Sequence, residues 1–185
     1  LVGQSPYSAS KIAADQLAIS YYNSFDLPIK IARPFNTYGP RQSARAIIPT
    51  VIGQLLNEHD DITVGNLDPL RDLTYVEDTV SGLLSICKSN KLIGQATNIG
   101  MNQVISISRL IEKIKDKMGV SINVKQDLNR IRPEKSEVDK LQCDNNKLIS
   151  HTNWSPLYDL DSGLTKTINW MRDNMEHYKS KKYNV

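Results

Sequence analysis

The pattern of apolar and polar residues predicts an alternation of helices and strands. Ser5 and Pro6 are typical of a helix N-cap and first turn, and helix-compatible residues continue to about Tyr22. Residues 29–32 then form a short β-prone run. A helix followed by a strand is half of a βαβ unit, so the start of the sequence indicates an α/β fold.

The same alternation continues along the chain. We expect a loop at residues 34–45, outside the carboxyl end of the first strand, which is the edge where open α/β sheets bind ligands. Further elements are expected as helices at 47–56, 77–88, 107–118, 144–150 and from about 161, and as strands at 62–64, 73–76, 96–99 and 122–125. The helix at 77–88 places four apolar residues on one face, namely Val80, Leu83, Leu84 and Cys87.

Composition changes this picture little. Hydrophobic residues make up 39% of the 185 residues and charged residues 23%, which is ordinary globular usage. The net charge is +3 and the sequence pI is near 8.8. Because Lys and Arg are interspersed with Asp and Glu along most of the chain, we expect no nucleic-acid partner.

Cysteine usage and hydropathy exclude several further classes. Cys87 and Cys143 lie far apart without CxxC spacing, which argues against a zinc site and a disulfide framework. We interpret His59, beside Asp60 and Asp61, as part of a solvated turn, so no metal is expected. The sequence has no run of about 18 apolar residues and no signal-peptide pattern, so we expect a cytoplasmic protein without membrane contact.

Tyr7 and Lys11 are the first candidate catalytic residues. They are four apart in the expected helix, so their side chains project from the same face. A lysine ammonium near a phenol favours the phenolate and lowers the tyrosine pKa from about 10 towards the range of a general base. Many helices contain this spacing by chance, so the neighbouring sequence must decide.

That neighbourhood carries a specific resemblance. The run SPYSASKIAADQL followed by IARPFNTYGPRQ resembles the YxxxK helix and substrate loop of the extended short-chain dehydrogenase/reductase family that acts on nucleotide sugars. The order continues through IIP, LRDLTYVEDT, TNIG, IRPEKSEV, and DNNK with WSP, so nearly the whole chain is covered. RPFNTYGPRQSARAIIPT and RPEKSEV most resemble the UDP-N-acetylglucosamine 4,6-dehydratases of the legionaminic acid pathway.

The resemblance implies NAD as cofactor and assigns the residues that face it. Tyr7 would take the proton of the sugar 4-hydroxyl while hydride leaves C4 for NAD. Lys11 would hold the nicotinamide ribose and tune Tyr7, and Pro34 would lie beside the nicotinamide.

It also assigns contacts to a nucleotide-diphosphate sugar. Arg71 would bind the diphosphate, and Arg132 is a second candidate for this contact. Asn98 would have a similar role. For either arginine the alternative is a surface ion pair. The remaining implied contacts are Asn36 to the substrate, the backbone at Ile47, Ile48 and Pro49 to the nucleotide, Ile62 and Val64 flanking the base, and Glu137 to a ribose hydroxyl.

The implied fold is α/β, the C-terminal part of a Rossmann-like doubly wound parallel sheet with a small α/β substrate-binding lobe. Residues 1–45 and 73–100 would belong to the Rossmann-like domain, and residues 46–72 and 101–185 mainly to the lobe. The sequence begins with Leu1 and contains no GxxGxxG phosphate loop, so we expect part of a longer enzyme that is inactive on its own. Its uncovered sheet edge is expected to make the isolated chain poorly soluble or dependent on association.

The implied reaction is 4,6-dehydration of a nucleotide sugar, with C4 oxidation, water elimination and hydride return to C6. A nucleotide-sugar 4-epimerase is the alternative, since both begin with C4 oxidation and the Asp-Glu pair that separates them lies upstream of Tyr7 in relatives. A non-catalytic sugar-nucleotide-binding or dimerisation fragment is an alternative of another class. The resemblance also implies that the full-length parent is a homodimer.

Overall fold

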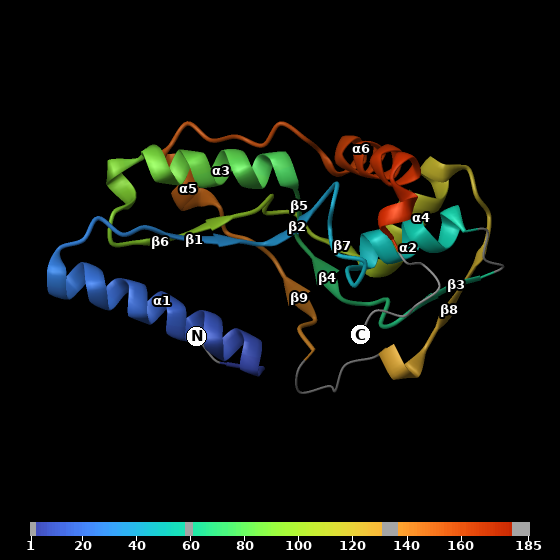
Figure 1. Ribbon diagram of the computed structural model, residues 1–185, viewed down its shortest axis with the longest axis horizontal. Coiled ribbons are helices and arrows are strands. Elements are labelled where there is room, and N and C mark those ends of the chain that lie inside the picture. The colour runs from blue at the N-terminus through green and yellow to red at the C-terminus, as the bar shows by residue number, and fades with distance from the viewer. Residues whose placement is uncertain (1–2, 58–60, 131–136, 179–185) are drawn as a thin grey trace.

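The computed structural model describes residues 3–57, 61–130 and 137–178, and Figure 1 shows an elongated molecule with two lobes along its long axis. Its helices are α1 (Pro6–Phe25), α2 (Ile47–Leu56), α3 (Val76–Lys88), α4 (Ile107–Met118), α5 (Asn146–His151) and α6 (Leu160–Asp173), with short 3-10 helices η1 (Asn90–Leu92), η2 (Leu128–Arg130) and η4 (Met175–His177). Its strands are β1 (Ile31–Pro34), β2 (Asn36–Tyr38), β3 (Asp61–Val64), β4 (Leu70–Arg71), β5 (Leu73–Tyr75), β6 (Ala96–Ile99), β7 (Ile105–Ser106), β8 (Asn123–Gln126) and β9 (Lys140–Leu141).

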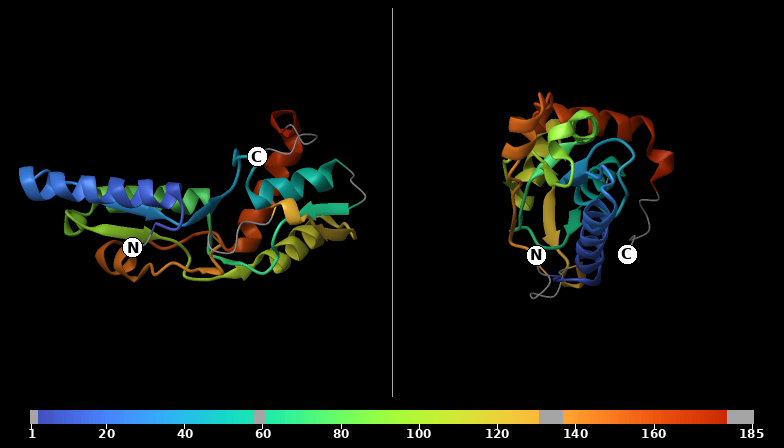
Figure 2. Two further views of the ribbon diagram at one scale, coloured as in Figure 1. Left: turned by 90° about the horizontal axis from the view of Figure 1, so that it is seen from below. Right: turned by 90° about the vertical axis from the view of Figure 1, so that its left-hand side faces the viewer.

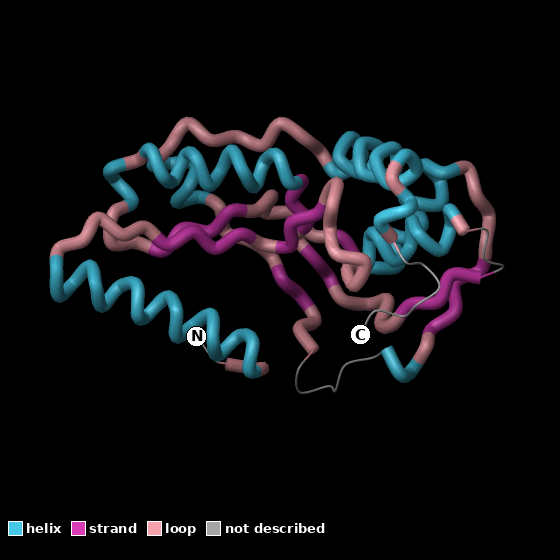
Figure 3. The backbone as a smooth tube through the Cα atoms, viewed as in Figure 1, coloured by secondary structure: helices cyan, strands magenta, loops and turns pink. Residues whose placement is uncertain are grey.

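Most strand pairs are parallel and join segments far apart in sequence. Figure 3 shows the strands in magenta, with helices around them. β1 pairs with β6, β2 with β5 and β3 with β8, all in parallel. β4 lies between β7, which is antiparallel to it, and β9, which is parallel. Since helices connect the parallel partners, the arrangement is of the α/β class that the alternation of elements predicts.

The helix α1 begins and ends as its sequence predicts. Ser5 is the N-cap and forms a capping box with Ser8, and Pro6 opens the first turn. The helix ends at Asp26, whose φ of 51° is left-handed. Figures 1 and 2 show α1 running along the first lobe with its N-terminal end towards the middle of the molecule, and α3 lies on the other side of the β1–β6 pair.

The larger core lies in the second lobe, where α2, α4 and α6 pack together beside the β3–β8 pair. Their buried side chains are mainly Ile, Leu and Val, as expected for helices with one apolar face. Gly163 lets α6 approach β2 closely, because a Cβ there would clash with the Tyr38 ring and hydroxyl. The core therefore fixes β2 and α2, which carry residues of the candidate site.

A smaller core lies in the first lobe and contains Ile86, Leu92, Ile99, Leu148 and Trp154. The helix α5 packs on β6, so residues 146–154 lie with the first lobe rather than with the rest of 101–185. The other predicted domain boundaries stay predictions.

One expectation about the elements is wrong, and α3 differs from what its apolar pattern would suggest about burial. The segment predicted as a loop at residues 34–45 contains β2, because residues 36–38 pair with β5 through contacts that local sequence does not reveal. On α3 the face with Val80, Leu83, Leu84 and Cys87 is exposed, and the buried positions include Thr79, Gly82 and Ile86. Asp78 lies in the first turn of this helix, and its buried carboxylate accepts hydrogen bonds from the backbone amides of Leu157 and Tyr158.

Within the described ranges, none of the helices combines the length and the apolarity needed to span a bilayer.

Candidate functional site

Tyr7 and Lys11 lie together at the N-terminal end of α1. The Lys11 Nζ atom is 5.6 Å from the centroid of the Tyr7 ring, which agrees with the prediction that both project from the same face. The Tyr7 side chain is 72% exposed, and its phenol is therefore open to a reactant. An ion pair of 2.6 Å between Arg33 and Asp15 connects this helix to β1.

Tyr38, by contrast, is a poor candidate for proton transfer. Burial raises the pKa of its phenol far above the ordinary value of 10. Its hydroxyl donates to the Leu160 carbonyl over 3.3 Å. Tyr7 is thus the better placed of the two phenols for acid–base chemistry.

A cavity of about 360 Å³ lies between the loop before α2, the segment around β4 and the turn after β8. Five residues assigned to the substrate from the sequence line it, namely Asn36, Ile47, Ile48, Arg71 and Glu137. The other residues that line it are Gln42, Arg45, Ala46, Gly65, Asn66, Pro69, Leu73, Ile107 and Arg130. The size and the mixed lining are typical of a small-molecule site.

Arg71 and Glu137 contact each other in this cavity. The Arg71 Nη2 donates to Glu137 Oε1 over 2.8 Å, and the Arg71 Nη1 donates to the carbonyls of Val138 and Leu70. Both side chains are largely buried, with 18% and 14% exposed. The guanidinium is thus held in one orientation with donors remaining for an anion.

Asp72 fixes the backbone around Arg71. Its buried carboxylate accepts hydrogen bonds from the amides of Met101 and Cys143, over 2.9 and 3.0 Å. Since these amides lie just beyond β6 and β9, one carboxylate connects three strands. We read Asp72 as a structural anchor for the Arg71 side of the cavity, a role that the sequence pattern did not reveal.

Two buried polar atoms of the lining have no hydrogen-bond partner among the described residues. They are the Nδ2 of Asn36 and the Oε1 of Gln42. Buried polar groups are nearly always paired, so these atoms mark positions where a ligand would gain hydrogen bonds. Asn36 was predicted to contact substrate, and Gln42 was missed.

The structure does not bring every predicted residue to this cavity. The side chains of Ile62, Val64 and Pro49 are buried and do not line it. Asn98 lies on β6, where its Nδ2 donates to the Asp144 carbonyl over 3.3 Å. Pro34 ends β1 at an exposed position.

Two further assigned positions lie outside the described residues, Arg132 of the substrate assignments and His59 of the solvated turn. Arg130, two positions before Arg132, does line the cavity. Its Nη1 donates to the Thr63 carbonyl over 2.7 Å, and it pairs with Asp127. Arg45 is a second unpredicted cation in the lining. Spacing alone could not separate Arg130 from Arg132, because the segment 127–144 offers no periodicity.

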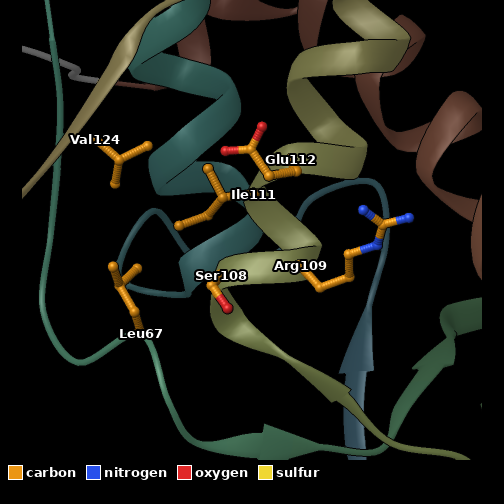
Figure 4. A pocket seen from close by; sticks show the side chains of 6 residues that line it. All are labelled: Leu67, Ser108, Arg109, Ile111, Glu112 and Val124. Atoms are coloured by element: carbon orange, nitrogen blue, oxygen red, sulfur yellow. The ribbon is translucent and has the colours of Figure 1, made fainter.

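Other cavities carry fewer of the predicted residues. One of about 230 Å³ lies over the first turns of α4, where Leu67, Ile111 and Val124 form an apolar wall beside Ser108, Arg109 and Glu112 (Figure 4). Another of about 300 Å³ shares Arg71 and Leu73 with the main cavity and extends to Asp159 and Asp161. Among the described residues, His, Cys, Asp and Glu side chains nowhere form a group of three that would hold a metal ion.

Comparison with known proteins gives one consistent result. The family model described as GDP-mannose 4,6 dehydratase matches residues 1–167. The dTDP-glucose 4,6-dehydratase of Neisseria gonorrhoeae is 30% identical over 178 residues, which cover 92% of this chain and 51% of the relative. The UDP-glucuronate 4-epimerase of Thermodesulfobacterium geofontis is 30% identical over 178 residues, covering 95% and 53%. The chain thus spans about half the length of these curated relatives.

Solved structures agree. The dTDP-glucose 4,6-dehydratase of Bacillus anthracis, in complex with NAD, superposes with a TM-score of 0.88 at 27% identity, covering 98% of this chain and 57% of that chain. This similarity and the parallel strand pairs confirm the predicted fold class, part of a Rossmann-like α/β structure with a smaller lobe.

Proposed function

Because the chain belongs to the GDP-mannose 4,6 dehydratase family, within the NAD-dependent short-chain dehydrogenase/reductase class, we propose that it is part of a nucleotide-sugar 4,6-dehydratase. This membership confirms the family resemblance of the motifs. The observation that carries the proposal is the pairing of an exposed Tyr7 phenol with the Lys11 ammonium, 5.6 Å from the ring, on the helix that opens the family match.

Tyr7 acts as the base in this proposal. In the phenolate form, which the ammonium of Lys11 would stabilise, it takes the proton of the sugar 4-hydroxyl and becomes a neutral phenol. The chemistry that bound NAD would supply here is hydride transfer, from C4 of the sugar in the oxidation and back to C6 at the end. The exposed Tyr7, Lys11 and Pro34 fit the ribose and nicotinamide end of such a cofactor, and the 185 residues contain no glycine-rich loop for its pyrophosphate.

The cavity holds the sugar nucleotide. Arg71 is oriented by two carbonyls and Glu137 and would bind the diphosphate, with Arg45 and Arg130 adding positive charge. Asn36 and the backbone of Ile47 and Ile48 would contact the substrate. Oxidation at C4 acidifies the C5 proton of the sugar, so water is eliminated across C5 and C6 and a 4-keto-6-deoxy sugar nucleotide results.

We propose UDP-N-acetylglucosamine as the substrate, on the strength of the RPFNTYGPRQSARAIIPT and RPEKSEV segments. The test is to incubate the full-length parent with NAD and this sugar nucleotide and to follow a 4-keto product by mass spectrometry. A product that has lost one water supports the proposal, and an unchanged substrate contradicts it.

A 4-epimerase is the second candidate, favoured by the 30% identity to a UDP-glucuronate 4-epimerase over 95% of this chain. Both reactions use the same C4 oxidation by Tyr7, so they differ only in later steps. In the same assay, a product of unchanged mass with inverted C4 identifies the epimerase. A full-length parent without an Asp-Glu pair upstream of Tyr7 would also favour it.

The state of the protein is part of the proposal. We expect the full-length parent to be a cytoplasmic homodimer and the 185-residue chain alone to be inactive. Light scattering of the parent tests the dimer, and an activity assay of the isolated chain tests its inactivity.

A further inference from the structure

We propose that Gln42 is a specificity-determining residue of the main cavity and that it recognises an amide of the substrate, a C=O beside an N–H. This inference rests on the proposed function, because it takes the cavity of about 360 Å³ as the site of a sugar nucleotide. It goes further, since it names the chemical group that the cavity selects.

Gln42 is held in place through its backbone. Its amide donates to the Gly39 carbonyl over 3.2 Å in a tight turn, and its own carbonyl accepts from the Tyr178 hydroxyl over 3.0 Å. The turn places Arg41 at a φ of 66°, an uncommon conformation for a residue with a side chain. Such backbone geometry costs free energy, so the contacts around the turn must hold it in place.

The Gln42 side chain is held as well. Its Nε2 donates to the Thr37 carbonyl over 2.9 Å. This bond fixes which end of the amide faces the carbonyl, because the reverse orientation would bring two oxygens together. Oε1 is then the free end, and it is buried without a donor among the described residues. The cavity therefore has a preorganised acceptor that requires an N–H or O–H from a ligand.

Asn36 offers a hydrogen-bond donor to the ligand, where Gln42 offers an acceptor. Its Nδ2 is a buried donor without an acceptor among the described residues, and it lines the same cavity. A secondary amide offers an acceptor and a donor in a rigid arrangement, which complements this pair. A carboxylate cannot donate to Gln42 Oε1, and a hydroxyl lacks the fixed geometry of the two groups.

A sugar nucleotide carries such an amide in two places. One is the ring amide of the base, as in uracil, and the other is the acetamido group of a 2-acetamido sugar. Both groups present a C=O beside an N–H, so the ligands of the test must separate a contact to the base from a contact to the acetamido group.

The test compares wild type with Gln42→Met in the full-length protein, by calorimetric titration with UDP, UDP-glucose and UDP-N-acetylglucosamine. Met preserves the length of the side chain and removes the acceptor. Gln95→Met is the matched control, since the Gln95 Nε2 also donates to a backbone carbonyl, that of Lys91 over 3.0 Å, away from the cavity lining. Melting temperatures of all three proteins establish that each is folded.

An acetamido contact predicts that Gln42→Met weakens UDP-N-acetylglucosamine about tenfold and leaves the other two ligands unchanged. A base contact predicts a similar loss for all three. In that case wild type should also bind UDP methylated at N3 more weakly than UDP. Gln42→Met should bind UDP and N3-methyl-UDP with equal affinity. Gln95→Met should bind every ligand as wild type does.

Unchanged affinity of Gln42→Met for all three ligands overturns the inference, as does a loss for both UDP-sugars without a loss for UDP. The inference is also overturned if Gln42→Met loses affinity for all three ligands while wild type binds N3-methyl-UDP as tightly as UDP. If wild type binds none of these ligands, the proposed function of the cavity fails, and the inference fails with it.

Discussion

The guanidinium of Arg71 donates a hydrogen bond of 2.8 Å to the carboxylate of Glu137, a residue 66 positions further along the chain. Sequence motifs assigned these residues to different parts of a substrate, the diphosphate and the ribose. In the structure they form one ion pair at the wall of the cavity. The carboxylate therefore competes with a phosphate for the positive charge of Arg71.

Replacing Glu137 with Gln should strengthen UDP binding about three- to tenfold, because the competing negative charge is removed. Arg71 keeps its orientation in this variant through the carbonyls of Leu70 and Val138. Calorimetric titration at low salt measures the effect, and Arg71→Gln should show the opposite, a clear loss. Weaker binding by Glu137→Gln would instead support its contact to a ribose hydroxyl.

Replacing Tyr7 with Phe in the full-length parent should lower turnover by about 10²- to 10⁴-fold, because the phenol is the proposed base. The affinity for UDP-sugar should stay close to that of wild type, since the ring remains and the groups proposed to bind the nucleotide and the diphosphate are unchanged. Steady-state kinetics and direct titration separate the two quantities. Unchanged turnover would remove Tyr7 from the mechanism.

Local sequence predicted the helices well, because each has a capping signal or an apolar period of its own. Ser5 and Ser106 are N-caps in the structure, with side chains that accept from the amides three residues on. β2 was missed because its partner β5 is 37 positions away in the register, as Asn36 pairs with Leu73. The exposed apolar face of α3 shows the other limit, since periodicity identifies a face but not what covers it.

The residues of the candidate site were likewise predicted only in part from the sequence. The motifs found Asn36, Ile47, Ile48, Arg71 and Glu137, which the chain brings to one cavity. They missed Gln42 and Arg130, because the positions of these side chains depend on the carbonyls of Thr37 and Thr63 rather than on any spacing. Hydrogen bonds from a side chain to a backbone carbonyl have no signature in a single sequence.

Gly163→Ala should destabilise the protein by about 1–3 kcal/mol, because the new methyl group would clash with Tyr38 where α6 meets β2. Gly53→Ala is the matched control within α2, where a Cβ would meet nothing within 4 Å. That variant should gain about 0.5–1 kcal/mol from the lower conformational freedom of its unfolded chain. Urea unfolding of both variants tests the pair, and equal effects would contradict the packing argument.

The two cysteines should differ in reactivity. Burial raises the pKa of the Cys143 thiol to about 12, and its side chain is 1% exposed, whereas Cys87 is exposed. With a coloured disulfide reagent at pH 8, one thiol should react quickly in the native protein and the second only after denaturation. Cys87→Ser should abolish the fast phase, and a fast phase of two thiols would show that Cys143 is accessible.

Acid should remove the stabilisation that Asp159 gives to α6. Asp159 is the N-cap, and hydrogen bonds from the side chain and amide of Ser162 lower its pKa from the ordinary value of 3.8. A carboxyl whose pKa is lowered on folding stabilises the native state above its unfolded pKa, and the effect is lost as the pH falls through the folded pKa.

Asp159→Ala should therefore be less stable than wild type by about 1 kcal/mol at pH 7, the usual cost of losing an N-cap. The difference should shrink as the pH is lowered from 4 towards 2, because wild type then loses the charged acceptor. Asp159→Asn is the control, since an amide caps a helix without titrating, so its difference from Asp159→Ala should stay constant over that range. Asp161, whose pKa is lowered mainly by its hydrogen bond from Lys113, is present in all three proteins, so its own loss of charge contributes to the stability of each. A pH-independent difference between wild type and Asp159→Ala, measured by urea unfolding, would show that the charge of the cap does not contribute.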